Sequence, residues 1–320
     1  METQGAFDVS VIVPVFNEEG AITRTLAALR TTLQSFGERR VEIICVDDGS
    51  KDGTAGILLA ESDVTVITHG VNRGYGAALR TGLDHARGEW VIIVDADGTY
   101  PLEQLPELME RASGTTQMVV GARRGPGIDD RRLHVLARWF LRQLVRSLTG
   151  VFVPDLNSGM RVFRRDLYEE FRHLLPMGFS FTTTLTVASL YSGYRVEYVP
   201  IRYDKRIGHS NIKPVRDFLR FVMLVVRLAS YFEPLKFFLP TAATILVLAT
   251  ARAVRDLVVN NGIGSFAVLL VVLGLQVFFV GILADVVVRR SETFHRSQRR
   301  SASDVRMARG RPAAAPEDRA

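Results

Sequence analysis

The chain has 320 residues, of which 47% are hydrophobic, and its formal net charge is +6. This length accommodates one full-sized domain and a smaller one. The single cysteine, Cys45, excludes a disulfide framework, and the sequence holds no zinc-ligand spacing. Cys45 lies inside an apolar run, which predicts an inert thiol in the protein core.

Strands and helices are expected to alternate through roughly the first two hundred residues. The expected strands are 9–15, 41–46, 64–68, 91–94, 119–122 and 193–203. Apolar residues at helical spacing occupy 21–36, and a later helix is expected to end near Ala86. Loops rich in glycine and aspartate follow most of the strands. This order predicts an α/β fold with a doubly wound, mostly parallel, Rossmann-like sheet.

The most informative loop begins at Asp95, directly after the apolar run Val91–Val94. Such a run is typical of a strand that is buried on both faces. Ligands of α/β sheets bind beyond the carboxyl ends of parallel strands, and Asp95 and Asp97 occupy alternate positions there. Their oxygens suit a hard divalent cation that also holds a diphosphate. The alternative interpretation is an Asp-Gly turn that caps the next helix.

Two further loops have a similar character. Asp47 and Asp48 end the second expected strand, where a carboxylate suits hydrogen bonding to a nucleoside base or ribose. Gly74 and Gly76 precede a helix, where backbone N–H groups can approach an anionic ligand. Turns also favour aspartate and glycine for purely structural reasons. The coincidence of such loops at the strand ends of one sheet favours a ligand site.

Four motifs in these loops resemble those of family-2 glycosyltransferases, whose catalytic domain has the GT-A fold. The motifs are PVFNEE at 14–19, VDDGSKDGT at 46–54, NRGYGAALRTGL at 72–83 and DADGTYP at 95–101. The resemblance implies a Mg²⁺ or Mn²⁺ ion on Asp95 and Asp97, with Asp97 as a catalytic residue. It also implies a nucleotide-sugar donor, UDP- or GDP-hexose. The implied donor-binding residues are Pro14, Asn17, Glu18, Asp47, Asp48, Gly76, Asp95, Ala96 and Asp97.

A basic segment follows the fifth expected strand. Arg123 stands at the strand end, and Arg123 and Arg131 are candidates for forked hydrogen bonds to phosphate oxygens. Arg138, Arg142 and Arg146 recur every four residues, which predicts one helix face. That face is expected to be either solvated or adjacent to a membrane.

The segment DLNSGMR at 155–161 resembles the DxxSGxR motif of the polyprenyl-phosphate branch of this family. That branch includes dolichol-phosphate mannose synthases and bactoprenol glucosyltransferases. By this resemblance Asp155 is a catalytic residue that orients the acceptor or acts as a base, and helix or turn capping is the structural alternative. The segment RIGHSNI at 206–212 resembles the RxGxSK loop of the same branch. The resemblance adds Ser158, Arg206 and Ser210 to Arg123 and Arg131 as candidate phosphate and acceptor ligands.

Two positions depart from the family pattern. Asn211 stands where the RxGxSK loop has lysine, and Lys205 is the candidate replacement for that cation. Thr99 stands where several relatives have a metal-binding glutamine. Metal coordination at position 99 is therefore left open.

The last third of the chain has the pattern of a membrane anchor. Residues 213–236 are mostly apolar with arginines in a narrow stripe, which predicts amphipathic helices in the membrane interface. A core helix with a solvated edge is the alternative. Two transmembrane helices are expected at about 237–254 and 265–288, joined by a short loop. Residues 289–320 are rich in arginine and are expected to form a basic, disordered cytoplasmic tail.

Arginines are concentrated after the second expected span, whereas the loop between the spans has one. The positive-inside rule then puts the C-terminus in the cytoplasm, and two crossings put residues 1–212, the expected catalytic domain, on the same side. The N-terminus has neither the basic region nor the apolar region of a signal peptide. We therefore expect a two-span protein of the cytoplasmic membrane with both termini in the cytoplasm.

Together these features predict an inverting, metal-dependent glycosyltransferase that moves a hexose from a nucleotide sugar to a polyprenyl phosphate of the undecaprenyl or dolichyl type. One alternative is a processive polysaccharide synthase, but Val135 replaces the glutamine of its QxxRW motif and only two spans are expected. Another is a catalytically silent, membrane-tethered scaffold that binds nucleotide sugars. Membrane lipids are expected partners, nucleic acid is not, and a homo-oligomer is left open.

Overall fold

The computed structural model describes residues 7–112, 115–125, 132–178, 180–203, 223, 227, 231–232, 234–260 and 262–309. The chain divides into two compact units, Met1–Val225 and Val226–Ala320. The first unit contains a β-sheet with its covering helices, and the second contains two long helices.

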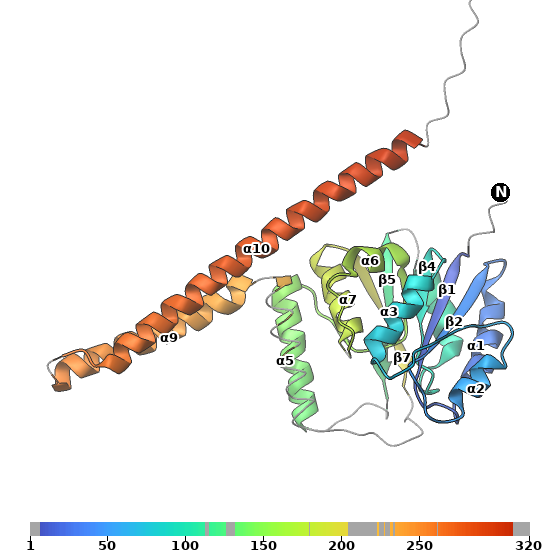
Figure 1. The fold of residues 1–320 in the computed structure, drawn as a ribbon, viewed down its shortest axis with the longest axis horizontal. Coiled ribbons are helices and arrows are strands. Elements are labelled where there is room, and N and C mark those ends of the chain that lie inside the picture. Colours follow the sequence, from blue (N-terminus) through green and yellow to red (C-terminus); the bar gives the residue numbers. More distant parts are fainter. Residues whose placement is uncertain are drawn as a thin grey trace, which may run out of the picture. The chain divides into compact units, whose positions relative to one another are not determined.

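A seven-stranded sheet forms the centre of the first unit, with the spatial order β3-β2-β1-β4-β6-β5-β7 (Figure 1). The strands are β1 (Val9–Val15), β2 (Val41–Asp47), β3 (Thr65–Thr68), β4 (Trp90–Ile93), β5 (Thr116–Arg124), β6 (Arg161–Arg164) and β7 (Arg195–Arg202). β1 pairs in parallel with β2 and β4, β2 with β3, and β5 with β7. The prediction of a mostly parallel α/β sheet is confirmed.

One strand departs from the prediction. β6 lies between β4 and β5 and runs antiparallel to both. Its sequence, RVFR, is charged at both ends, so it lacks the long apolar run that marks the other central strands. Because Arg161 pairs with Ile93, the residues before Arg161 continue past the carboxyl end of β4. This pairing brings the DxxSGxR segment to the edge of the sheet where the Asp95 loop begins.

Helices cover both faces of the sheet (Figure 1). In the first unit they are α1 (Ile22–Leu33), α2 (Thr54–Leu59), α3 (Tyr75–His85), α4 (Leu105–Arg111), α5 (Arg132–Thr149), α6 (Arg165–Phe171) and α7 (Phe181–Tyr191), with 3-10 turns η1 (Gln34–Phe36) and η2 (Leu102–Gln104). The odd-numbered residues of β1 pack in one core cluster with residues of α1 and α4. Ile12 faces α3 instead, where a Cβ on Gly82 would come within 2.6 Å of its side chain.

Cys45 of β2 is fully buried, as predicted. Burial raises the pKa of its thiol to about 12. The thiolate, which is the reactive form of cysteine, is therefore scarce near neutral pH. Cys45 is a core residue.

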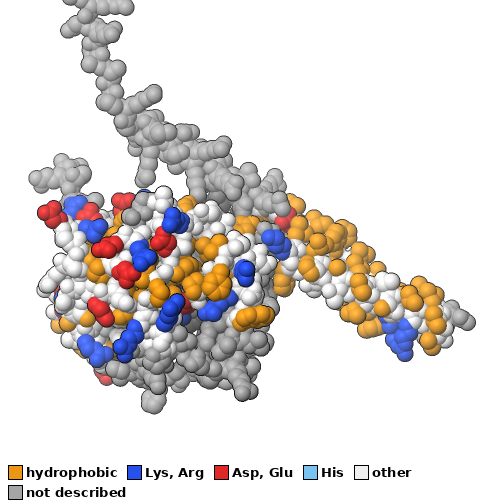
Figure 2. Space-filling model, turned by 180° about the vertical axis from the view of Figure 1, so that it is seen from behind, with side chains coloured by type: hydrophobic (Ala, Val, Ile, Leu, Met, Phe, Trp, Pro, Cys, Tyr) orange, Lys and Arg blue, Asp and Glu red, His pale blue; other side chains and the backbone are white. Residues whose placement is uncertain are grey.

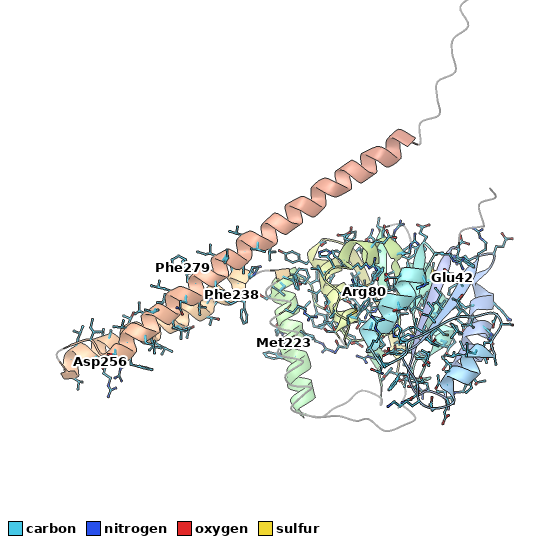
Figure 3. The ribbon with its side chains drawn as sticks, in the orientation of Figure 1. Glu42, Arg80, Met223, Phe238, Asp256 and Phe279 are labelled. Atoms are coloured by element: carbon cyan, nitrogen blue, oxygen red, sulfur yellow. The ribbon has the colours of Figure 1, made fainter. Side chains whose placement is uncertain are left out.

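A buried carboxylate, Glu42, joins β1 and β2 to the loop before β4 (Figure 3). Its Oε1 accepts hydrogen bonds from Ser10 Oγ at 2.6 Å and from the backbone N–H of Arg87 at 2.7 Å. Its Oε2 accepts from Nε and Nη2 of Arg87 at 3.0 and 2.8 Å. Burial alone would raise the pKa of Glu42, but the hydrogen bonds from Ser10 and Arg87 outweigh burial and hold the pKa below its ordinary value.

The second unit is a hairpin of two helices, α9 (Pro234–Asn260) and α10 (Ser265–Arg309). Each contains a segment that is long and apolar enough to cross a membrane, Pro234–Val259 and Ser265–Val288. Hydrophobic side chains cover much of the outer surface of this hairpin (Figure 2). The exposed ones include Val247, Val258, Leu269 and Leu283. The predicted pair of apolar helices is confirmed, and α9 extends a few residues beyond its predicted ends.

Glycines let the two helices approach each other closely. A Cβ on Gly274 would come within 2.7 Å of the Leu246 side chain, and one on Gly281 within 2.6 Å of Phe238 (Figure 3). Close backbone approach at small residues is the usual way in which apolar helices pack without a hydrophobic driving force in lipid.

A polar contact closes the turn of the hairpin. Asp256 is buried and pairs with Arg252, one helical turn earlier, at 3.1 Å. The same carboxylate accepts a hydrogen bond from the backbone N–H of Gly264 at 3.3 Å. The end of α9 and the start of α10 are therefore held by one side chain.

The C-terminal segment differs from the prediction. α10 continues to Arg309, so residues 289–309 are helical where a disordered tail is expected from composition. That segment contains neither proline nor glycine, and these residues next occur at Gly310 and Pro312. Arginine, alanine and methionine are compatible with a helix, so a high charge does not by itself end it. The interface helices predicted for 213–236 fall mostly outside the described residues and stay a prediction.

We expect Glu42→Gln to lower the free energy of unfolding by about 2 kcal/mol at pH 7, because the uncharged amide leaves buried partners unsatisfied. The melting temperature in detergent should fall by about 4–8 °C. Since the pKa of folded Glu42 is depressed, its contribution is present above the unfolded value of about 4.3 and is lost as pH falls through the folded pKa. The exposed Glu38→Gln is the matched control, and equal melting temperatures for both variants would contradict the prediction.

Candidate active site

The carboxyl ends of β2, β1 and β4 are neighbours in the sheet, so the loops that follow them meet at one edge. Hydrogen bonds join the loops after β1 and β2. The backbone N–H of Asn17 donates to Ser50 Oγ at 2.9 Å, and Lys51 N–H donates to Asn17 Oδ1 at 2.8 Å. Glu18 N–H donates to Thr54 Oγ1 at 2.9 Å. Asn17 and Glu18, two of the residues predicted to bind the sugar donor, thus lie at this edge and hold the loops after β1 and β2 together.

Pro14 differs from the other predicted donor residues of this loop. It lies inside β1, opposite Val46 of β2, and it is buried. The side chain of Pro14 is therefore part of the sheet, and its predicted contact with a sugar donor stays a prediction.

Of the two aspartates after β2, Asp48 is fully engaged inside the protein. Its Oδ1 accepts from the backbone N–H of Arg73 at 2.9 Å and lies 2.7 Å from His69 Nδ1. Its Oδ2 accepts from the backbone N–H of Gly74 at 2.7 Å. Asp48 therefore positions the loop before α3. Asp47 Oδ1 accepts hydrogen bonds from the backbone N–H of Ser50 at 3.1 Å and from the Ser50 hydroxyl. The described residues supply no hydrogen bond to Asp47 Oδ2. This geometry favours Asp47, and not Asp48, as the residue that binds the nucleotide-sugar donor.

His69 is a part of this site that sequence analysis does not single out. It is buried just after β3, and its Nε2 lies 2.9 Å from Thr81 Oγ1 on α3. With Nδ1 directed at Asp48, the ring links α3 to the Asp48 carboxylate. The only signal in the sequence is its place at a strand end.

The start of α3 is covered by protein. The backbone N–H of Ala77 donates to Met177 O at 2.8 Å. A Cβ on Gly76 would come within 2.5 Å of the carbonyl oxygens of both Pro176 and Gly178. Glycine at position 76 is therefore required by the segment 176–178. The predicted contact between Gly76 and a sugar donor stays a prediction.

Asp95 and Asp97 stand at the carboxyl end of β4, as predicted, and both are partly exposed. The hydroxyl of Tyr75 donates to Asp95 Oδ1 at 2.9 Å. The N–H and hydroxyl of Thr99 donate to Asp97 Oδ1 at 3.1 and 2.7 Å, so Thr99 orients this carboxylate. Burial, followed by the charge of Asp97, raises the pKa of Asp95 to about 6. The two carboxylates therefore repel each other in surroundings of low polarity.

These carboxylates suit a divalent cation that is shared with a substrate. The part of the chain that the structure describes contains no group of three or more His, Cys, Asp or Glu residues arranged to hold a metal alone. Mg²⁺ is commonly bound by one or two carboxylates together with substrate phosphates. A cation on Asp95 and Asp97 would also relieve the repulsion that raises the pKa of Asp95. The residues present thus fit the predicted Mg²⁺ or Mn²⁺ ion.

The DxxSGxR segment packs against this pair. A Cβ on Gly159 would lie 2.5 Å from Asp95 Oδ2, so only glycine fits there. The backbone N–H of Gly159 donates to the hydroxyl of Tyr100 at 2.7 Å. From the other side, Thr25 Oγ1 donates to Ala96 O at 2.9 Å, and the Ala96 side chain is buried. The predicted donor residue Ala96 therefore belongs to the frame of the loop.

Arg123 and Asp155 form a forked ion pair. Arg123 Nε donates to Asp155 Oδ2 at 2.7 Å, and Nη2 donates to Oδ1 at 3.0 Å. The guanidinium also lies over the ring of Tyr203, 5.2 Å from its centroid. Burial alone would raise the pKa of Asp155, but the hydrogen bonds and charge of Arg123 outweigh it and lower the pKa. A carboxylate with a lowered pKa that accepts two hydrogen bonds from a guanidinium is a poor base. The geometry therefore favours the alternative that Asp155 orients Arg123.

Ser158 and Arg161 of the same motif are fully buried. Arg161 donates to Thr182 O at 3.0 Å and to Thr186 Oγ1 at 2.9 Å on α7, and also to Ser158 O. Ser158 Oγ is buried without a hydrogen-bond partner among the described residues. The Ser158 hydroxyl does not reach the surface, and its contact with an acceptor phosphate stays a prediction. Arg161 thus joins β6 to α7.

Three predicted phosphate or acceptor ligands, Arg131, Arg206 and Ser210, lie outside the described residues. Lys205 and Asn211 lie outside them as well. Their roles stay predictions.

The sheet of the first unit has the fold of several solved glycosyltransferase structures. Glucosyl-3-phosphoglycerate synthase from Mycobacterium tuberculosis, in complex with UDP, has a TM-score of 0.53 and 23% identity, covering 70% of this chain and 79% of that chain. Mannosyl-3-phosphoglycerate synthase from Rubrobacter xylanophilus has a TM-score of 0.54 and 22% identity, covering 70% and 73%. At this identity the likeness shows the fold alone.

Residues 10–172 match Glycosyl transferase family 2, and the chain belongs to this family. Residues 233–289 match the GtrB C-terminal hairpin. The predicted family resemblance is confirmed.

Curated relatives match about half of the chain. The undecaprenyl-phosphate 4-deoxy-4-formamido-L-arabinose transferase of Pseudomonas paraeruginosa is 37% identical over 169 residues, 50% of this chain and 48% of the relative. The prophage bactoprenol glucosyl transferase homolog of Escherichia coli K12 is 34% identical over 172 residues, 52% of this chain and 55% of the relative. The chain thus spans about half the length of the curated relatives it matches.

We expect Tyr75→Phe to weaken Mn²⁺ binding by about 10-fold in the presence of UDP, because Asp95 loses the hydrogen bond that orients it. Titration followed by electron paramagnetic resonance of free Mn²⁺ measures this directly. Tyr168→Phe is the matched control, since it removes a similar tyrosine–carboxylate bond, to Asp84, away from the site. Equal Mn²⁺ affinities in the two variants would contradict the assigned role of Tyr75.

Proposed function

We propose that this protein transfers a hexose from a UDP- or GDP-linked sugar to a polyprenyl phosphate. The observation that carries the proposal is the pairing of Asp95 and Asp97 at the strand edge that also presents Asp47 and the Arg123–Asp155 pair. Two curated relatives are named as transferases of undecaprenyl phosphate or bactoprenol. The C-terminal hairpin supplies the membrane anchor that a lipid acceptor requires.

Asp95 and Asp97 would hold a Mg²⁺ or Mn²⁺ ion together with the diphosphate of the donor. When bound, such an ion neutralises the charge that develops on the leaving nucleoside diphosphate. A fold neighbour from Mycobacterium tuberculosis was crystallised with Mn²⁺ and UDP, which supports this assignment at the level of the fold. Asp47, with one carboxylate oxygen not engaged by the described residues, would contact the base or ribose.

In the reacting step, a phosphate oxygen of the lipid forms a bond to the anomeric carbon of the sugar. The bond between that carbon and the diphosphate oxygen breaks, and its electron pair leaves with the nucleoside diphosphate. Attack from the opposite side inverts the configuration. The attacking oxygen is already anionic, so no general base is needed, in agreement with the lowered pKa of Asp155.

Arg123 would bind the acceptor phosphate. Asp155 occupies two of its nitrogens and Tyr203 covers its face, which leaves one orientation for the remaining N–H groups. Fixed donors of this kind contribute to catalysis by positioning the reactants and by neutralising charge. Arg131, Arg206 and Ser210 are the further candidates for this task.

We place the reaction at the cytoplasmic leaflet, with residues 1–212 as the catalytic domain. The arginines that follow the second apolar segment support a cytoplasmic C-terminus by the positive-inside rule. With two crossings, the first unit lies on the same side. Nucleotide sugars are made in the cytoplasm, which is consistent with that orientation.

We expect Asp97→Ala to lower sugar transfer by at least about 100-fold, because the cation loses one of its two carboxylate ligands. Purified full-length protein is incubated with undecaprenyl phosphate, Mg²⁺ or Mn²⁺, and labelled UDP-glucose, UDP-galactose or GDP-mannose in parallel. The chloroform-soluble, mild-acid-labile product is counted. Asp63→Ala, which removes an exposed partner of Arg30, is the matched control and should retain activity.

Each outcome of this experiment has a defined meaning. A lipid product from one donor, abolished by EDTA and by Asp97→Ala, supports the proposal and identifies the sugar. Full activity of Asp97→Ala overturns the role of the carboxylate pair. Binding of UDP without any lipid product points to the scaffold alternative or to another acceptor.

A further inference from the structure

The segment 70–74 borders two parts of the candidate site. It belongs to neither a helix nor a strand and joins β3 to α3. On one side its backbone lies against the loop after β2, because a Cβ on Gly49 would come within 2.7 Å of the carbonyl carbon of Val71. On the other side it leads directly into Tyr75, whose hydroxyl donates to Asp95. The segment therefore touches the loop after β2 and leads to the carboxylates after β4.

A single buried carboxylate anchors this segment. Residues 71–73 are exposed, so burial of their own side chains does not fix it. The backbone N–H groups of Arg73 and Gly74 instead donate to the two carboxylate oxygens of Asp48, at 2.9 and 2.7 Å. The conformation of the segment 70–74 thus depends on the direction in which the Asp48 carboxylate points.

His69 fixes that direction. The side chains of His69 and Asp48 are 5% and 4% exposed, and Nδ1 lies 2.7 Å from Oδ1. An ionised carboxylate only accepts hydrogen bonds, so Nδ1 carries the proton and donates it to this contact. In the neutral ring Nε2 then accepts from the hydroxyl of Thr81 on α3, at 2.9 Å. The imidazole is therefore held on both sides.

The Asp48 carboxylate depends on its donors because it is buried. Each hydrogen bond that a buried carboxylate loses leaves part of its charge uncompensated. Without the imidazole, the N–H of Arg73 is the one donor that the described residues supply to Oδ1. The carboxylate then gains by turning toward other donors, and the N–H groups bonded to it move with it. Loss of His69 therefore displaces the segment 70–74.

The proposed donor contacts lie on both sides of this segment. Asp47 ends β2 and is assigned to the nucleoside, whereas Asp95 and Asp97 follow β4 and are assigned to the cation and the diphosphate. Because the segment 70–74 borders both places, a nucleotide that occupies both lies next to it. A displaced segment would therefore weaken nucleotide binding.

We propose that His69 is a positioning residue for the nucleotide-sugar donor. Through Asp48 it holds the segment 70–74 in the conformation against which the nucleoside diphosphate binds. The inference rests on the proposed function, which supplies the donor. It concerns the affinity for the donor and not the transfer step, since the imidazole is buried.

Two amide side chains imitate the two ring nitrogens separately. The side-chain amide of asparagine is as many bonds from the backbone as Nδ1, and that of glutamine is as many as Nε2. His69→Asn therefore retains a donor for Asp48 and loses the contact with Thr81. His69→Gln retains the contact with Thr81 and loses the donor for Asp48.

Binding of UDP and of GDP to purified full-length protein is measured by calorimetry in the presence of Mn²⁺. We expect His69→Gln to weaken binding by about 10-fold, because a hydrogen bond to a charged group contributes about this factor. His69→Asn should weaken it less. In the transfer assay the KM of the sugar donor should rise with the dissociation constant, while kcat and the KM of polyprenyl phosphate change by less than about twofold.

Hydrogen–deuterium exchange without nucleotide observes the segment itself. The peptide that covers 70–74 should exchange faster in His69→Gln than in the parent protein or in His69→Asn. Glu42→Gln is the matched control for stability alone, since Glu42 lies near the opposite end of β2 from Asp47. It should lower the melting temperature without changing nucleotide affinity or exchange at 70–74.

The outcomes separate this inference from the proposed function. Nucleotide affinity that is equal in the parent protein and in His69→Gln overturns the role of His69 and leaves the proposed function intact. A lower kcat with an unchanged donor KM assigns His69 a purely structural role and also overturns the inference. A parent protein that binds neither UDP nor GDP overturns the proposed function and this inference together.

Thr81→Val tests the same link with a smaller perturbation, because it removes only the hydroxyl behind the ring. It should weaken nucleotide binding by about threefold, the contribution of a hydrogen bond between uncharged groups. If His69→Gln does not fold, unchanged nucleotide affinity in Thr81→Val overturns the inference.

Discussion

Two carboxylates that repel each other at the end of a buried strand are the constraint around which the first unit is built. The Tyr75 hydroxyl donates a hydrogen bond to Asp95, and the absence of a side chain at Gly159 leaves space for the Asp95 carboxylate. The Thr99 hydroxyl donates a hydrogen bond to Asp97 and orients it. Without a cation, this arrangement raises the pKa of Asp95 to about 6. Two like charges in poorly solvated surroundings are stabilised when a positive charge binds between them.

A second charged pair has the opposite character. Arg123 and Asp155 neutralise each other through a forked contact, and Tyr203 covers the guanidinium. The first pair is the candidate site for a cation, whereas the second holds the guanidinium of Arg123 in a fixed orientation. The Asp95–Asp97 pair and Asp155 therefore differ in their predicted roles, although in the sequence all three are aspartates in loops.

Strands β1, β2 and β4 could be predicted because parallel strands buried on both faces carry long apolar runs. Asp95 and Asp97 could be predicted because their strand ends so abruptly. β6 could not, since RVFR is short and charged at both ends and pairing with β4 and β5 defines it. The surroundings of Gly76 could not be predicted, since the segment 176–178 that meets it follows much later in the sequence, and the burial of Ser158 depends on the tertiary fold.

The antiparallel insertion of β6 also imposes an order on folding. During synthesis, β1, β2, β3 and β4 are all made before β6, and they pair with one another without it. β6 can pair with β4 only after residues 161–164 have been made. A nascent chain that ends before Arg164 therefore carries the Asp95–Asp97 loop beside an open sheet edge. Completion of the reaction centre is consequently a late event, and it coincides with burial of the guanidinium of Arg161.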